Sequence, residues 1–482
     1  MKHYATFFLI ASMSLGLVFL LFTRARESHN APAEVIEVKA PVADAGPEAG
    51  PTVASSASAA PAAVDAAAVD AGPAAASLRV ATLGWELAAP AATLGATSSV
   101  EVAPEASLDE LEKRLARGGS DPQGADVAIL PLPSFVMSYE HLSALKLQAF
   151  LVVGFSHGRE EVHANAGALL RAPPGADEVK VVSGGSESAN VLALFSVDLL
   201  GVAPSRIRMV TAEADVKAAA FSAVVKGTSD TRKLAFSTAD ASRLVPIVAV
   251  APKAVLDARE KELQDWSKSW LEGLGAVAND VPGVSRKLAG KTDVRLASGV
   301  GGAPEALVLV ERLGLIERVA LDRETSIMGP LAKSPVTLET LMTRTWQLSR
   351  GAGLATAAAP DPLPVDTRIL TAIAPAPKDA PAPTAPEGDA GAEKFGPLPT
   401  GTVPLVMYRA TDGDADKVAT QIHFLSGVFE RAYFKVQAKG GEKAAKAIAA
   451  AARDKGVASS RLATTAGDPP GAVAAVELLA PP

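Results

Sequence analysis

Residues 154–158 read GFSHG and fit the G-x-S-x-G pattern, in which a sharp strand-to-helix turn presents a nucleophilic serine. An apolar run, AFLVV, leads into the turn, as the pattern requires. Hydrolases of this kind carry an acid and then a histidine after the serine. The histidines after Ser156 are its neighbour His157, His163 seven residues further on, and the distant His423. None of them is placed to act as the base, so we expect that the chain is not an enzyme.

Metal and nucleotide motifs are imitated but not matched. The stretch 157–163 reads HGREEVH, but zinc helices of the H-E-x-x-H type carry histidines four residues apart, and these are six apart. Residues 290–292 read GKT, like the end of a phosphate-binding loop, but Ser285 stands where that motif needs its first glycine. We therefore expect neither a metal ion nor another cofactor.

Composition excludes several further classes. The chain of 482 residues has a net charge of −7 and no long basic tract, which argues against a nucleic-acid partner because binding phosphates requires clustered Lys and Arg. It has no cysteine, so it can form no disulfide, thiolate metal site or cysteine nucleophile. Its length is enough for two or three domains.

The N-terminal region predicts a membrane anchor. Ala5–Phe22 is an uncharged run of 18 residues, which as a helix would be about 27 Å long and could cross a thin hydrocarbon core. Lys2 precedes the run, and Arg24 and Arg26 follow it. The nearest small-residue cleavage site lies well downstream, after several charges, so we expect an uncleaved transmembrane helix within residues 1–26 rather than a removed signal peptide.

Two segments rich in alanine and proline divide the rest of the chain. Residues 27–77 and 374–396 have frequent prolines and few large apolar side chains, which is typical of extended linkers. They set off a body, residues 78–373, from a small C-terminal domain, residues 397–482.

The body alternates strand and helix patterns, which predicts an α/β fold with largely parallel sheets. Short apolar runs at 78–84 and 125–130 predict strands, and serine-capped segments at 107–117 and 186–200 predict helices. The C-terminal domain repeats the pattern on a small scale, with strand-like VPLVMYR and RAYFKVQAK and helix-like 415–429.

Polar turns follow several of the predicted strands. In an open parallel sheet such turns face the ligand crevice, and helix N-termini there favour anions. The alternative for each turn is local: serines cap helices, and a tryptophan packs in the core. The predicted ligand-binding residues in these turns are Trp85, Glu86, Ser156, His157, Ser183, Ser186, Ser237, Thr238 and Asp240.

With these pieces in order, residues 78–372 resemble a type 2 periplasmic substrate-binding protein of the nitrate, sulfonate and taurine group. The matching stretches include LRVATLGWELAAPAATL, ADVAILPLPSF, AFLVVGFSHGREEVHA and VKVVSGGSESANVLALFSVDLLGV. The resemblance implies two α/β lobes that close on a small solute. It also implies that AFLVV and PIVAV are the strands that cross between the lobes.

The resemblance adds one site residue and a preference for the ligand. Members of this family often carry Ser-x-Gly-x-Asp after the first crossover, where this chain has SHGRE at 156–160, so Glu160 joins the predicted ligand-binding residues. In the stretch that resembles the floor of the second lobe, Lys226, Arg232 and Lys233 would favour an anionic ligand; the alternative is that they are solvated surface residues.

The C-terminal domain resembles a shortened OmpA-like domain across FKVQAKGGEKAAKAIAAAARDKGVASSRLATTAG. The Asp and Arg with which that family holds peptidoglycan are replaced, since the turn reads AKGGEK and the helix EKAAKA. The domain therefore lacks those peptidoglycan anchors, and the alternative is a small α/β domain that binds another partner.

We therefore expect a single-pass protein of the cell inner membrane whose folded part lies in the periplasm. It would capture a small ligand between two lobes for ABC-type uptake or for sensing, with an ABC permease or an envelope protein as partner. Two alternatives stay open. One is an envelope scaffold whose cleft binds nothing, and the other is an anchored hydrolase that uses Ser156.

Overall fold

The computed structural model describes residues 77–94, 100–171, 178–291, 293–294, 306–321, 326–328, 334–374 and 397–482. The predicted anchor and nearly all of both predicted linkers lie outside the described residues. In the described ranges, no helix combines the length and the apolar character needed to cross a membrane.

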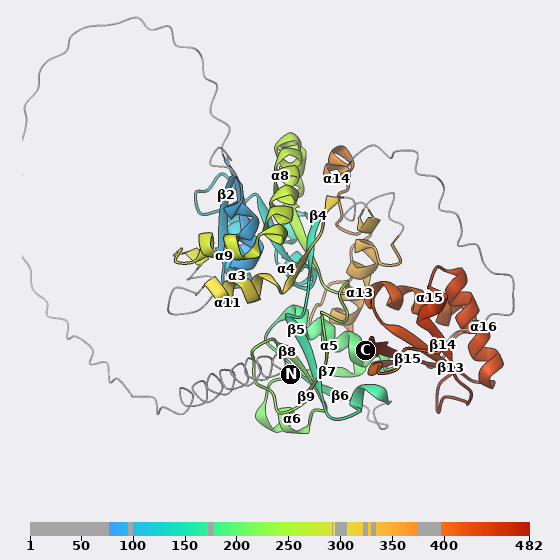
Figure 1. The fold of residues 1–482 in the computed structure, drawn as a ribbon. Coiled ribbons are helices and arrows are strands. Elements are labelled where there is room, and N and C mark those ends of the chain that lie inside the picture. The colour runs from blue at the N-terminus through green and yellow to red at the C-terminus, as the bar shows by residue number, and fades with distance from the viewer. Residues whose placement is uncertain are drawn as a thin grey trace, which may run out of the picture. The chain divides into compact units, whose positions relative to one another are not determined.

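A six-stranded mixed sheet forms the first lobe (Figure 1). In order across the sheet, its strands are β11 (Ile316–Arg318), β4 (Leu147–Ser156), β10 (Pro246–Pro252), β3 (Val127–Pro131), β1 (Leu78–Leu83) and β2 (Val100–Glu105). β1, β2 and β3 are parallel, and β10 runs antiparallel between β3 and β4. Every residue of β3 and β10 is buried, which explains why these strands are continuous apolar runs in the sequence.

A five-stranded sheet forms the second lobe. Its strands are, in order, β7 (Ile207–Val210), β6 (Val179–Val182), β8 (Phe221–Val225), β5 (Glu160–Ala164) and β9 (Lys233–Ser237). β6, β7 and β8 are parallel, whereas β5 is antiparallel to both of its neighbours. The first sheet thus has two reversed strands, β10 and the short edge strand β11, and the second sheet has one, β5.

The chain crosses between the two sheets at β4 and at β10. β4 belongs to the first sheet and leads through a short turn into β5 of the second, and β9 of the second sheet leads back into β10 of the first. β4 and β10 also lie side by side, paired antiparallel. The crossovers AFLVV and PIVAV expected from the sequence are confirmed, since they lie within β4 and β10.

Serine caps begin the helices that matter for the site. Ser107 accepts a hydrogen bond from the Glu110 N–H and starts α3 (Leu108–Arg117), and Ser186 likewise starts α5 (Glu187–Leu199). Both helices were expected from the sequence. Between these two in the chain lies α4 (Leu132–His141), directly after β3. Further helices are α2 (Trp85–Ala88), α6 (Glu213–Ala218), α7 (Lys253–Ala258), α8 (Glu260–Asn279), α9 (Val281–Leu288), α11 (Ala306–Leu313), α13 (Leu338–Gly351) and α14 (Arg368–Ile373).

The C-terminal region, residues 397–482, forms a four-stranded sheet with two helices. In chain order its elements are β12 (Val403–Ala410), α15 (Ala415–Val428), β13 (Tyr433–Ala438), α16 (Gly441–Asp454), β14 (Leu462–Thr464) and β15 (Ala474–Ala480). The sheet order is β12-β15-β13-β14. A small α/β fold is therefore present, while the OmpA-like resemblance stays a prediction.

The C-terminal region shares its core with the second lobe. The ring of Phe429, at the end of α15, lies 6.4 Å from that of Phe195 in α5 and 5.9 Å from that of Phe236 in β9. All three side chains are fully buried and belong to one continuous apolar cluster. The C-terminal region thus packs directly against the second lobe and shares its hydrophobic core.

Candidate ligand-binding cleft

A cavity of about 530 Å³ lies between the two lobes. The first lobe lines it with the turn after β1, the start of α3, the end of β3 and a side chain from α11. The second lobe lines it with the turn after β4 and the start of α5. We call this cavity the cleft. Residues from both lobes, far apart in the sequence, therefore face one small space.

Three helices begin at the cleft. Ser107 and Ser186, the caps of α3 and α5, both line it, as does Ser134 in the first turn of α4. Unpaired N–H groups and the helix dipole make such helix ends favourable for negative charge. Asp109 and Glu187, in the first turns of α3 and α5, also line the cleft and already supply negative charge there.

Arg312 supplies a positive charge to the wall of the first lobe. Its Nη2 atom lies 2.6 Å from Oε1 of Glu86, a side chain that is almost completely buried. The guanidinium also lies over the ring of Trp85, with 5.7 Å between Cζ and the ring centroid. Since one end of the group is held by Glu86 and one face by Trp85, the arginine is fixed in place while about a third of it stays exposed.

Glu160 forms the floor of the cleft on the second lobe. Its side chain is 2% exposed, and its Oε2 accepts hydrogen bonds from the hydroxyls of Ser156 and Thr238, the latter at 3.3 Å. Arg159 is the nearest cation, with its Nε 4.0 Å from Oε1. Burial raises the pKa of the Glu160 carboxyl, and Arg159 and the two hydroxyls offset this only in part.

This carboxyl also marks the place where the two crossovers meet. Ser156 is the last residue of β4, and Thr238 follows β9, the strand that leads back toward β10. Thr238 accepts a hydrogen bond from the Gly158 N–H at 2.8 Å. Three predicted ligand-binding residues, Ser156, Glu160 and Thr238, thus form one hydrogen-bonded group in which Glu160 alone faces the cleft.

Other predicted residues lie in local turns. Ser183 donates to Asn190 Oδ1 at 3.1 Å, and the Asp240 carboxylate accepts from the Ser237 N–H at 2.9 Å. These bonds close turns in the way that the alternative interpretation from the sequence describes. Ser183, Ser237 and Asp240 are not among the residues that line the cleft, whereas Glu86, Glu160 and Ser186 are.

Trp85 and His157 lie elsewhere. Trp85 is fully buried in a small apolar cluster with Val277 and Val284, so its ring is covered by the protein instead of forming an open wall of the cleft. The His157 Nδ1 atom lies 3.9 Å from Oε2 of Glu317, and His157 is not among the residues that line the cleft.

The environment of Ser156 does not resemble that of a nucleophile. Its hydroxyl donates to Glu160 and lies 3.3 Å from the Thr238 hydroxyl. Among the described residues no histidine bonds to it: His163 pairs with Glu161 at 2.9 Å. The arrangement lacks the base that a serine hydrolase requires. In the described ranges there is also no cluster of three residues suited to hold a metal ion.

Sequence reasoning missed Arg312, Ser134 and Glu187 as cleft residues. Arg312 lies 226 positions after its partner Glu86 and carries no local motif, so only the fold reveals the pair. Glu187 had a usable signal, because it directly follows the helix cap Ser186 and must lie at the same helix end.

No family model matches the chain, and no curated protein matches its sequence. Solved structures with a similar fold include the alkanesulfonate-binding protein SsuA from Xanthomonas axonopodis pv. citri bound to MOPS, at 12% identity and a TM-score of 0.39, covering 59% of this chain and 95% of that one. The aliphatic sulphonate-binding SsuA from Escherichia coli is similar at 13% identity and a TM-score of 0.40. The match covers 59% of this chain and 90% of that one. The ligand-binding component of an ABC-type import system from Staphylococcus aureus is similar at 13% identity and a TM-score of 0.37. The match covers 61% of this chain and 97% of that one.

Proposed function

We propose that the protein captures a small ligand reversibly in the cleft between its two lobes, without covalent chemistry. The observation that carries this proposal is the cleft itself, which both lobes line and behind which both crossovers meet. Two lobes joined by two neighbouring strands can close around a ligand as nearly rigid bodies. A volume of about 530 Å³ is in the range of small-molecule sites.

We infer that an anionic group of the ligand would bind at the two cations of the cleft. Arg159 from the second lobe and Arg312 from the first are the cations among its described lining residues, and three helix N-termini add to their effect. Glu86 holds one end of the Arg312 guanidinium, and burial raises the pKa of the Glu160 carboxyl. Asp109 and Glu187 would repel a polyanion, so a single anionic group fits better than several.

The wider role is also a proposal. The resemblance in the sequence and the apolar run Ala5–Phe22 support an anchored periplasmic protein of the inner membrane that serves ABC-type uptake or sensing. An ABC permease or an envelope protein would then be the partner that receives the ligand or the signal.

One observation favours the second candidate, a scaffold whose cleft binds nothing. The lobes already contact each other directly: Ser134 of the first donates to Glu187 of the second at 3.1 Å, and Lys226 Nζ lies 3.3 Å from Glu311 Oε1. Such contacts could hold the lobes together without a ligand. The two candidates differ in whether any small molecule stabilises the protein.

A thermal-shift screen of the full-length chain tests the proposal. The probes are nitrate, sulfate, phosphate, alkanesulfonates, phosphonates and short carboxylates at millimolar concentration, with alkyl amines as cationic controls. A ligand present at about 100 times its Kd adds about 2.7 kcal/mol to the free energy of unfolding. We expect at least one monoanion to raise the unfolding temperature.

Matched variants locate the effect. Arg312→Gln removes the cation on the first-lobe wall, whereas Arg286→Gln removes an exposed arginine of α9 that does not line the cleft. We expect the stabilisation to fall in Arg312→Gln and to persist in Arg286→Gln. Absence of stabilisation by every probe would favour the scaffold.

A further inference from the structure

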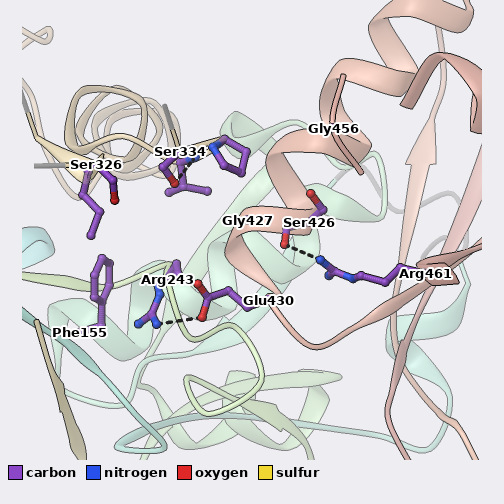
Figure 2. Close-up of a pocket in the computed structure, with 12 residues that line it drawn as sticks. Phe155, Arg243, Ser326, Ser334, Ser426, Gly427, Glu430, Gly456 and Arg461 are labelled. Carbon is purple, nitrogen blue, oxygen red and sulfur yellow. Dashed lines mark hydrogen bonds and ion pairs between the residues drawn. The ribbon is translucent and has the colours of Figure 1, made fainter. Parts of the chain in front are cut away.

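Arg243 is a buried cation beside the second crossover. It lies between β9 and β10, three residues before β10 begins, and its side chain is 5% exposed. A guanidinium so deeply buried must be compensated by negative charge. Its Nη2 atom lies 2.6 Å from Oε1 of Glu317. The same atom lies 2.8 Å from Oε2 of Glu430 (Figure 2).

The partners of Arg243 come from different parts of the fold. Glu317 is in β11, at the edge of the first sheet, where it is paired with Phe155 of β4. Glu430 follows α15 in the C-terminal region. The guanidinium also lies over the Phe155 ring, with 4.8 Å between Cζ and the centroid. One cation therefore contacts the first crossover, the first lobe and the C-terminal region, and stands beside the second crossover.

The same cation is close along the chain to the floor of the cleft. Phe155, under the guanidinium, precedes Ser156, which donates to Glu160. Thr238, the other hydroxyl on Glu160, lies five residues before Arg243. Arg243 is thus connected to the residues that bond to the cleft carboxyl in two ways. One is its contact with Phe155 near the end of β4, and the other is the stretch 238–243, which precedes β10.

The geometry makes the two ion pairs sensitive to lobe position. The C-terminal region is packed on the second lobe through Phe429, and its Val428 carbonyl accepts the Arg243 N–H at 3.2 Å. Glu317 belongs instead to the first lobe. When the lobes separate about the crossovers, the two carboxylates must move relative to each other, and one nitrogen atom cannot follow both.

The side chains have room for this movement. A second cavity, of about 340 Å³, borders Phe155, Arg243 and Glu430 as well as Ser426 and Arg461 of the C-terminal region (Figure 2). Close packing would hold the arginine in one arrangement, whereas an adjoining cavity allows it to exchange partners.

We propose that Arg243 couples the opening of the cleft to the C-terminal region. With the lobes arranged as in this structure the cation is shared between Glu317 and Glu430, and opening favours one partner over the other. The C-terminal region would thereby detect whether the cleft is open or closed. The inference rests on the proposed function for the role of the cleft, but the lobe movement can be measured without any ligand.

The absence of cysteine makes a clean distance measurement possible. Ala116→Cys on α3 and Ala214→Cys on α6 place one exposed label on each lobe of the full-length chain. Double electron–electron resonance then gives the distribution of distances between the lobes. This distribution is compared in the labelled parent, in Glu430→Gln and in Glu317→Gln. Each substitution removes one of the two carboxylate charges that pair with Arg243.

Glu477→Gln is the matched control. Glu477 is a carboxylate of the same C-terminal region, but it forms its ion pair with Lys435 of the same sheet, at 3.3 Å. We expect Glu430→Gln and Glu317→Gln each to shift the mean distance or to add a second population, beyond the spread between preparations. We expect Glu477→Gln to reproduce the parent.

Two results would overturn the proposal. One is an unchanged distance distribution in either Arg243-partner variant, whether or not its unfolding temperature falls, because the ion pairs would then only hold the region in place. The other is an equal change in Glu477→Gln, which would reflect a general loosening. Because no ligand is present, the outcome is independent of the thermal-shift screen.

Discussion

Truncation of Phe429 tests whether the C-terminal region and the body fold as one unit. The side chain is fully buried and packs on Phe195 and Phe236 of the second lobe. Replacing a buried phenylalanine by alanine typically costs about 3–5 kcal/mol, from lost burial and from the cavity that remains. We expect a loss of this size in the free energy of unfolding of Phe429→Ala.

The tryptophans allow the loss to be measured in the body alone. All of them lie before the C-terminal region, at Trp85, Trp266, Trp270 and Trp346. Urea unfolding of the full-length chain, followed by tryptophan fluorescence, therefore reports on the body. Because the core is continuous, a substitution in the C-terminal region should shift this transition to lower urea.

A matched control uses Val403→Ala, at the exposed start of β12, for which we expect a change within about 0.5 kcal/mol. If the fluorescence transition in Phe429→Ala stayed at its parent position while circular dichroism showed loss of structure, the reasoning would be refuted. The C-terminal region would then unfold on its own, and the shared core would contribute little to the body.

Further substitutions test individual contacts. Burial raises the pKa of Glu160 above its ordinary 4.5, so the folded state binds the proton more tightly than the unfolded state does. The stability that this contributes is present at low pH and is lost as the pH rises toward the raised pKa. Glu160→Gln should flatten that decline, measured by thermal melts across this pH range. Arg344→Ala leaves the Asp198 carboxylate, whose pKa burial already raises, without its cation, and should cost about 3 kcal/mol near pH 7 and less in acid, measured by urea unfolding at two pH values. Gly427→Ala should destabilise by about 1–3 kcal/mol despite better helix propensity, because the new Cβ would lie 2.5 Å from Val336 Cγ2; a more stable variant in the same assay would contradict this.

Features with a local cause could be predicted from the sequence. Ser107 and Ser186 signal helix starts because a hydroxyl satisfies backbone N–H groups only a few residues away. The apolar runs AFLVV and PIVAV predicted strands buried on both faces, and the family resemblance implied that they are the crossovers. Local reasoning brought Ser156 and Thr238 into consideration, and the family resemblance added Glu160, before the fold showed that the three meet.

Features that depend on distant partners could not be predicted. Trp85 in a Gly-Trp-Glu turn has the same local sequence whether it faces a cleft or a core, and only the helices packed over it decide. Arg312 gains its role from Glu86, and Arg243 from Glu430, which lie more than 180 residues apart in each pair. Side-chain charges carry no information on such partners until the topology brings them together.

The central claim is that the cleft holds the ligand and that Arg312 binds its anionic group. The most direct test is the Kd of the best monoanion from the screen, measured by isothermal titration calorimetry for Arg312→Gln beside the Arg286→Gln control. A hydrogen bond to a charged group contributes about 1.5–3 kcal/mol, so we expect the Kd to rise about 10- to 100-fold in Arg312→Gln only. Equal Kd values for the two variants would contradict the claim, because the anionic group would then be bound without Arg312.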